Sequence, residues 1–461
     1  MRDVALYSNL PRSNILSRSS DQIKPAIMKL QFIKSVIIAG LILLVFIQAD
    51  RNSAFSALKE DFHKGYLSLG IPELRIDYAA NLRSIKSATE LIEQEQFFEH
   101  IHSRWMAIDV QNLYGADLLD HQIMGYEIAL NKERLALESK WDPKTPLVAN
   151  KSIYSIPNGK EWYAYLLKKW VDLSVTPEEL YEFGASEIKK VKANMRQIQL
   201  ASGLSEDDFE TYLKGDRFLI TDPEKVQRAF EEVKKRVARK APQLFPYLDR
   251  IPDVVIDRGT NAALSHAPAY YNNNTFYYNL FDKPFNSRQL GWFYAHEAIP
   301  GHHYQSALNR VVKRSEIQEL FWYPGFVEGW GAYVEHLGEE LDAYTDIYDQ
   351  YGKWEWDLIR SVRVCLDIGI NYRGWSDEKA LAFWSSHIKD QEDIAKREIS
   401  RMKRWPAQVI TYKFGEAAIL SMRDKAKEQE GFSLKDFHRR ILQHGDIPIS
   451  ILLDRQDRNW D

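Results

Sequence analysis

One short stretch, residues 296–303 with the sequence HEAIPGHH, constrains the fold of this chain more than any other. It brings together three imidazoles and one carboxylate, the groups that bind Zn²⁺ in catalytic sites. The usual motif places two histidines four residues apart on one face of a helix, with a glutamate after the first. Here Pro300 stands in the position of the second histidine. A regular helix therefore cannot form the site.

Pro300 and Gly301 decide which imidazole can be the second ligand. On a straight helix His302 would lie about 240° around the axis from His296, and His303 would lie about 10.5 Å along it. Because proline interrupts a helix and glycine lets the backbone relax, we expect a kink or bulge here. A distortion that absorbs two residues puts His302 in the ligand position, and one that absorbs three puts His303 there. We prefer His302 because it needs the smaller distortion, and His303 stays open.

A second stretch, residues 326–335 with the sequence FVEGWGAYVE, supplies the expected third ligand. Glu328 follows a Pro-Gly pair near the start of a predicted helix, and two nearby glycines leave room beside it. Glu335 is on the same face but two turns further, too far to bind the same ion. We predict His296, His302 and Glu328 as the ligands of one Zn²⁺ per chain. Glu335 is the predicted partner of an imidazole N–H.

Glu297 is the predicted general base, because it is adjacent to a ligand and can take the proton of a metal-activated water. For the oxyanion the best candidate is Tyr412, since a phenol can donate a hydrogen bond to a developing negative charge. Lesser candidates are Tyr271, Lys413 and Arg363. Arg360 and Arg363, with Asp367 four residues after Arg363, form a pattern more typical of internal salt bridges than of a substrate clamp.

From about residue 57 onward, apolar residues recur at the spacing of amphipathic helices. Thr176, followed by Pro177 and Glu179, is a strong helix start, and Ser205, Ser287, Ser376 and Ser433 are further expected caps. Helices are expected at about 57–70, 88–104, 115–140, 161–173, 176–202, 205–213, 222–241, after Ser287, 315–321, 327–341, 348–370, 376–387, 390–402, 406–428 and 434–442.

A small sheet is expected just before the histidine stretch. Residues 254–257 form a short β-like run, and residues 269–279 (AYYNNNTFYYN) have two aromatic runs around an asparagine cluster, which predicts a hairpin. An edge strand here could hold an extended peptide by backbone pairing. The predicted fold class is mainly α: one large helical domain with a small β-hairpin or sheet beside the active-site helix.

The N-terminal region has the pattern of an export signal. Residues 1–27 are polar and predicted to be disordered, and residues 28–57 contain lysines followed by an apolar run from Val36 to Ile47. This run is shorter than the roughly 20 residues of a full span, which indicates a signal peptide or signal anchor. The expected location is periplasmic, or anchored to the outer face of the inner membrane by residues 35–49. Residues 58–461 are predicted to form a single catalytic domain.

Composition excludes some partners. The net charge of −4 gives no indication of nucleic-acid binding, so the expected partner is a peptide substrate, with membrane contact only through the N-terminal anchor. Cys365 is the only cysteine, which leaves neither an intrachain disulfide nor a cysteine near the signal for lipid attachment.

Residues 296–305 (HEAIPGHHYQ) resemble the His-Glu-x-x-Pro-Gly-His signature of the large bacterial family known as domain of unknown function 885. Further segments match in order: 176–184, 326–335, 360–369 with 374–375, 406–415 and 432–448. That family resembles helical zincin peptidases of the oligopeptidase and angiotensin-converting-enzyme type. The resemblance implies a zincin-like α fold, with His296, His302 and Glu328 as ligands and Glu297 as base. Two positions depart from it: Asn371 where the family commonly has histidine, and Ala407 where glycine is usual.

The leading functional hypothesis is an exported zinc-dependent metallopeptidase that hydrolyses short peptides. The same site would serve a metal-dependent hydrolase of a non-peptide amide or ester. A third hypothesis is a non-catalytic, membrane-tethered binding protein that keeps the fold, and Asn371 is the sequence feature that favours it.

Overall fold

The computed structural model describes residues 53–75, 77–148, 150–172, 175–265, 267–281, 283–458 and 460. The predicted leader and most of the predicted signal segment lie outside the described residues. The chain divides into two compact units, Met1–Ala57 and Leu58–Asp461, and the second contains all the elements below. Among the described residues, none of the helices combines the length and the apolar character that a membrane crossing requires.

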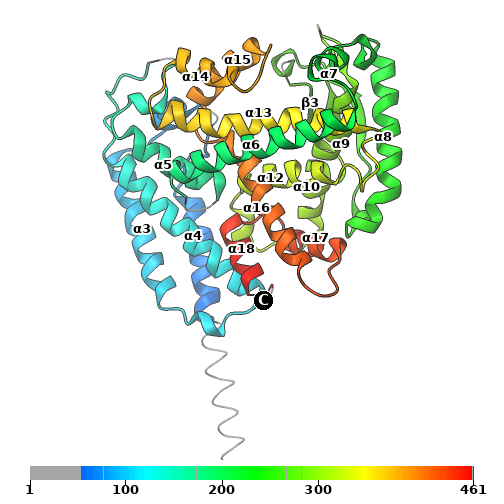
Figure 1. Ribbon diagram of the computed structural model, residues 1–461. Coiled ribbons are helices and arrows are strands. Elements are labelled where there is room, and N and C mark those ends of the chain that lie inside the picture. The colour runs from blue at the N-terminus through cyan, green and yellow to red at the C-terminus, as the bar shows by residue number, and fades with distance from the viewer. Residues whose placement is uncertain are drawn as a thin grey trace, which may run out of the picture. The chain divides into compact units, whose positions relative to one another are not determined.

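The second unit is mainly α-helical with small sheets, which confirms the predicted fold class (Figure 1). It begins with helical residues 58–68. The following helices are α2 (Tyr78–Arg83), α3 (Ala88–Met106), α4 (Gly115–Glu138), α5 (Gly159–Val171), α6 (Pro177–Ala201), α7 (Glu206–Leu213), α8 (Pro223–Leu244), α9 (Leu290–Glu297), α10 (His302–Val311), α11 (Glu316–Glu319), α12 (Pro324–Val334), α13 (Ile347–Asn371), α14 (Asp377–Ser385), α15 (Glu392–Arg404), α16 (Ile410–Lys427), α17 (Leu434–Leu442) and α18 (Ile449–Asp457).

Helix α13 is the central element of the unit. It lies side by side with α6 across the molecule (Figure 1), and every residue from Asp357 to Asn371 is buried. A helix that is buried all round must be covered by other elements, and α14, α15 and α16 pack against it in addition to α6. Its buried polar residues recur at three- and four-residue intervals and therefore share one face.

Helices α12 and α16 approach each other through glycines. A Cβ atom on Gly329 would lie 2.5 Å from the Cα of Gly415, and one on Gly415 would lie 2.1 Å from the carbonyl oxygen of Gly325. Larger side chains would force the helices apart. This contact brings Tyr412, in the first turn of α16, towards the helix that carries Glu328.

The main sheet has three strands in the order β2 (Val255–Arg258), β4 (Thr275–Tyr278) and β3 (Ala269–Asn272). β3 and β4 form the predicted antiparallel hairpin, with Asn273 and Asn274 at positive φ in its turn. β2 pairs with β4 in parallel, which was not predicted. β1 (Leu219–Ile220) and β5 (Phe285–Asn286) form a separate antiparallel pair. β3 is an edge strand and contacts α9.

Most predicted helix starts have the expected caps. Thr176 and Glu179 form a capping box, and Ser205, Ser376 and Ser433 accept hydrogen bonds from backbone amides. Ser287 was wrongly predicted as a cap. It is the first residue of a 3₁₀ turn (Ser287–Gln289) that Asn286 caps, because the Asn286 side chain accepts from the amide of Arg288.

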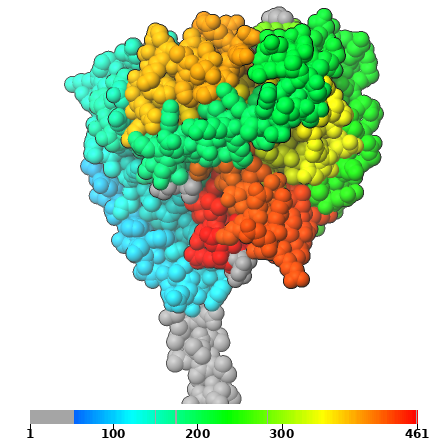
Figure 2. Space-filling model, viewed as in Figure 1, coloured from blue at the N-terminus to red at the C-terminus, as the bar shows by residue number. Residues whose placement is uncertain are grey.

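Two short helices were not predicted, α2 and α18. Figure 2 shows α18 (red) at the surface between the cyan N-terminal helices and the orange α17 region. A hydrogen bond of 2.9 Å from Gln122 to Asp454 joins α4 to α18. The last helix thus closes the fold against one of the first.

Candidate metal centre

The histidine stretch is interrupted more completely than predicted. Instead of one kinked helix, α9 ends at Glu297 and α10 starts at His302. A Cβ atom on Gly301 would lie 1.8 Å from the carbonyl oxygen of His296, so only glycine fits the return of the chain. The indole N–H of Trp330 donates to the carbonyl of Pro300 at 2.9 Å, which holds the connection against α12.

The break brings three side chains together. Nε2 of His302 lies 3.3 Å from Oε2 of Glu328, and Nε2 of His296 lies 3.9 Å from the same oxygen. One nitrogen or oxygen from each of these residues lies within 4.8 Å of the others. His303 is not in this cluster: its ring contacts the carbonyl of Pro252 at 2.7 Å. Of the two imidazoles left open by the sequence, His302 is the one at the cluster.

Glu335 supports the first imidazole from behind, as predicted. Its Oε1 atom lies 2.7 Å from Nδ1 of His296, and its Oε2 atom accepts a hydrogen bond of 2.7 Å from Arg360. Burial opposes the charged carboxylate, but the Arg360 charge outweighs it and lowers the pKa of Glu335 to about 2. The Glu335 carboxylate fixes the orientation of the His296 ring through Nδ1, and Nε2 of the same ring faces Glu328.

Burial and neighbouring charges shift the pKa values of His302 and Glu297. Burial works against a charged His302, but the hydrogen bond and charge of Glu328 raise the pKa of His302 to about 9. Burial also raises the pKa of Glu297, more than the neighbouring His296 lowers it. A raised carboxyl pKa brings Glu297 closer to neutral pH, where a general base is most effective.

The residues present fit a zinc ion. Zinc–ligand distances of about 2.0–2.2 Å place pairs of ligand atoms roughly 3–4 Å apart, which matches the two separations from Glu328. A Cβ atom on Gly331 would lie 2.8 Å from Cε1 of His296, so this imidazole occupies a space that only glycine leaves. Two imidazoles and one carboxylate are also a set that catalytic zinc takes in enzymes.

The structure also shows where the candidates for contact with the oxyanion or the substrate lie. The ring of Tyr412 is 6.4 Å from that of His296, centroid to centroid, and the Arg360 guanidinium lies 5.7 Å from the Tyr412 ring centre. Tyr271 lies on the hairpin beside His303. Asn371 is buried and donates to the carbonyl of Met402.

The structure gives Arg363 and Asp367 other partners than the expected salt bridge between them. Arg363 forms its salt bridge with Glu398 at 2.8 Å, not with Asp367. Asp367 instead accepts from the hydroxyl of Tyr163 at 2.7 Å and from the amide of Ala407 at 2.9 Å. The i, i+4 spacing on α13 would allow Arg363 and Asp367 to pair. Each of them instead binds groups from other parts of the fold.

Sequence reasoning missed a second cluster of possible ligand groups, His336, Asp357 and Glu416. Lys413 binds Asp357 at 2.6 Å and Glu416 at 3.2 Å, and Lys353 binds Asp357 at 3.0 Å. Two buried ammonium groups thus already neutralise the carboxylates, which makes this cluster a salt-bridge network rather than a cation site. His336 directly follows Glu335 in the sequence, and Lys353 lies on α13. Neither position indicated this pairing in the sequence.

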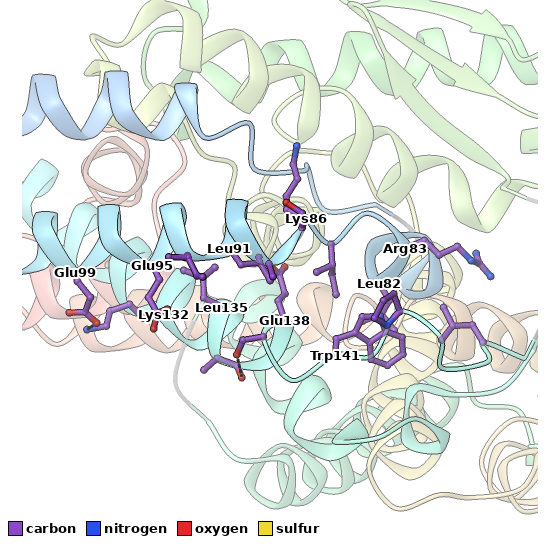
Figure 3. Close-up of a pocket in the computed structure, with 18 residues that line it drawn as sticks. Leu82, Arg83, Lys86, Leu91, Glu95, Glu99, Lys132, Leu135, Glu138 and Trp141 are labelled. Atoms are coloured by element: carbon purple, nitrogen blue, oxygen red, sulfur yellow. Dashed lines mark hydrogen bonds and ion pairs between the residues drawn. The ribbon is translucent and has the colours of Figure 1, made fainter.

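Two cavities lie away from the cluster of His296, His302 and Glu328. The first, about 910 Å³, is bounded by α2, α3 and α4 (Figure 3). Several of its charged groups are paired, as between Glu99 and Lys132 at 2.8 Å and between Glu138 and Arg134 at 2.6 Å. The second, about 760 Å³, lies beside α4 and α5. Neither is lined by His296, His302 or Glu328.

Comparisons with known proteins agree with the fold. A structure described as "the putative lipoprotein from Colwellia psychrerythraea" matches with a TM-score of 0.62 and 21% identity, covering 83% of this chain and 79% of that one. A "putative lipoprotein of unknown function from Shewanella oneidensis" matches with a TM-score of 0.54 and 19% identity, covering 79% and 73%. No curated protein matches. A family model matches residues 77–455, and the chain therefore belongs to the family of bacterial proteins of unknown function 885.

Proposed function

We propose that this protein is an exported zinc-dependent metallopeptidase that hydrolyses short peptides. The observation that carries the proposal is the convergence of His296, His302 and Glu328 beside Glu297. The resemblance of family 885 to helical zincin peptidases, drawn from the sequence, points to the same reaction. Zinc held by these ligands would polarise a carbonyl and make a bound water acidic near neutral pH.

The side chains of the chain have distinct roles in this proposal. Glu297 accepts the proton of the attacking water and returns it to the leaving amine. Glu335, held by Arg360, orients His296 and keeps its lone pair directed at the cluster. Tyr412 donates a hydrogen bond to the developing oxyanion, and the Arg360 guanidinium beside its ring stabilises the position of that ring.

The edge strand β3 supports a peptide as the substrate. β3 contacts α9, which carries His296 and Glu297, and its free edge offers backbone groups to an extended chain. Pairing with backbone groups recognises a peptide independently of its side chains. A non-peptide amide or ester would not use such an edge.

Export is supported by the sequence of residues 28–57 and by the description of both similar structures as lipoproteins, a class of exported, membrane-anchored proteins. The only cysteine of this chain, Cys365, is buried in α13. The proposed attachment is therefore through the apolar segment at residues 35–49, not through a lipid on cysteine.

The test compares hydrolysis of a short-peptide library by the wild type and by Glu297→Gln. We expect the variant to retain zinc and to lose activity by about 10²–10⁴-fold, the usual contribution of a general base. Cleavage of model amides or esters without any peptide cleavage would favour the non-peptide hydrolase. Full zinc content without hydrolysis of any substrate would favour the binding protein.

A further inference from the structure

The second cavity has an aromatic lining and a way in from solvent. Its volume is about 760 Å³, and it lies between α4, α5, residues 66–86 and the turn that leads into α12. At its rim Leu67 is 60% exposed and Trp322 is 53% exposed. The rings that line it include Tyr66, Trp162, Tyr165, Trp170, Phe321 and Trp322.

Glu127, on α4, provides a buried carboxylate in this aromatic wall. The residue is only 1% exposed, and its Oε1 atom makes no hydrogen bond to any described residue. Its ion-pair partner Lys169 keeps its Nζ 3.9 Å away, which is beyond hydrogen-bond distance. Burial raises the pKa of Glu127, and the charge of Lys169 and a hydrogen bond from the Tyr323 hydroxyl to the carboxylate oppose this. A buried carboxylate oxygen without a hydrogen bond, as Oε1 is, costs free energy that a ligand N–H could recover.

The guanidinium in the same wall already has three acceptors. Arg134 donates to Asn131 at 3.1 Å, to Glu138 at 2.6 Å and to Gln94 at 2.7 Å, one bond from each of its nitrogens. An anionic ligand would therefore have to compete with these acceptors. The group in this wall that lacks a hydrogen bond is the Oε1 atom of Glu127, so the ligand that fits is a hydrogen-bond donor, and a positive charge on that donor would suit the carboxylate.

We propose that this cavity binds a primary ammonium group attached to an aromatic or aliphatic body. Glu127 forms a charge-assisted hydrogen bond to the ammonium, and the surrounding rings offer their faces to the cation and pack on the apolar body. Lys169 competes for the same carboxylate and turns towards solvent when the ligand binds. The source is either a free amine or the amino terminus of a short peptide, which have this chemistry in common.

Titration calorimetry on the full chain tests the proposal, with a chelator present so that the result does not depend on the metal centre. The probes are 2-phenylethylamine, 3-phenylpropionate, and the dipeptide phenylalanyl-alanine with and without an N-acetyl group. We expect the amine and the free dipeptide to bind, and the acid and the acetylated dipeptide not to bind. Tighter binding of the dipeptide would identify a peptide amino terminus as the source.

Two variants separate Glu127 from its competitor. Glu127→Gln should weaken amine binding by about tenfold or more, the value of one hydrogen bond to a charged group. Lys169→Met should strengthen it, and this variant keeps the test valid if Glu127→Gln fails to fold. Binding of the acid as tight as that of the amine, or amine affinity that neither variant changes, would overturn the proposal. Glu297→Gln should bind the amine as the wild type does, which distinguishes this site from the metal centre.

Discussion

Nδ1 of His296 lies 2.7 Å from one oxygen of Glu335, and the other oxygen of that carboxylate lies 2.7 Å from Arg360. Arg360 belongs to α13, in the stretch from Asp357 to Asn371 where every residue is buried. The first predicted metal ligand is therefore held in position by a chain of contacts that ends in the core. Because Glu335 and Arg360 are both buried and charged, loss of one leaves the other uncompensated.

Glu335→Gln should lower the affinity for zinc by about 10–100-fold, because partners of this kind orient the imidazole and raise its basicity. Competition with a chromophoric chelator measures the affinity directly. Glu340→Gln is a matched control, since Glu340 is exposed on the same segment. Equal zinc affinity in the two variants would show that Glu335 does not support the metal ligand.

Gly331→Ala should impair zinc binding with little loss of stability. The new Cβ would lie 2.8–3.1 Å from three atoms of the His296 ring, which must move away from the cluster. Gly329→Ala should have the reverse effect, a large loss of stability with little change in zinc binding. Its Cβ would meet the backbone of Gly415 at 2.5 Å and force α12 away from α16. Zinc affinity and urea unfolding, measured on both variants, check the contrast. A stability loss of the same size in both would contradict it.

The metal-free protein should lose stability as the pH rises. The pKa of His302 is raised to about 9 in the folded state, against about 6.5 for an unperturbed imidazole. The contribution of the charge pair with Glu328 to stability is thus complete below about pH 6.5, declines above it, and is lost as the pH passes through about 9. Urea unfolding in chelator at about pH 6 and about pH 10 measures this, and His302→Gln should remove this part of the pH dependence. Unchanged pH dependence in the variant would assign it to other groups.

Lys413→Met should destabilise the fold by about 3–5 kcal/mol, because it leaves the buried carboxylates of Asp357 and Glu416 short of one cation. Zinc content should not change, since Lys413 contacts none of the predicted ligands. Urea unfolding with parallel metal analysis tests both parts. Loss of zinc from a folded Lys413→Met variant would show that the second cluster takes part in metal binding.

Local signals in the sequence predicted most of the helices. The capping box at Thr176 and Glu179 and the asparagine turn at Asn273 and Asn274 act within a few residues, so their effect can be read along the chain. Short elements with little periodicity, such as α2, could not be read in this way. Nor could the parallel pairing of β2 with β4, because it joins strands separated by intervening chain.

Part of the candidate site was also predictable from signals that act within a few residues. The residue types and the Pro-Gly break pointed to His296, His302 and Glu328, but sequence spacing alone could not decide between His302 and His303. A carbonyl from a distant segment, that of Pro252, takes His303 away from the cluster. The partners of Arg363 and the lysines beside Asp357 also come from other helices, and no spacing rule within α13 reveals them.

The zinc content of the purified full chain tests the central claim most directly, measured for the wild type, His302→Gln and His303→Gln. We expect about one zinc per chain in the wild type and in His303→Gln, and almost none in His302→Gln. His303 is a suitable control because it is buried, adjacent in sequence and bound to Pro252 instead of the cluster. A wild type without zinc, or a His302→Gln variant that keeps it, would contradict the account.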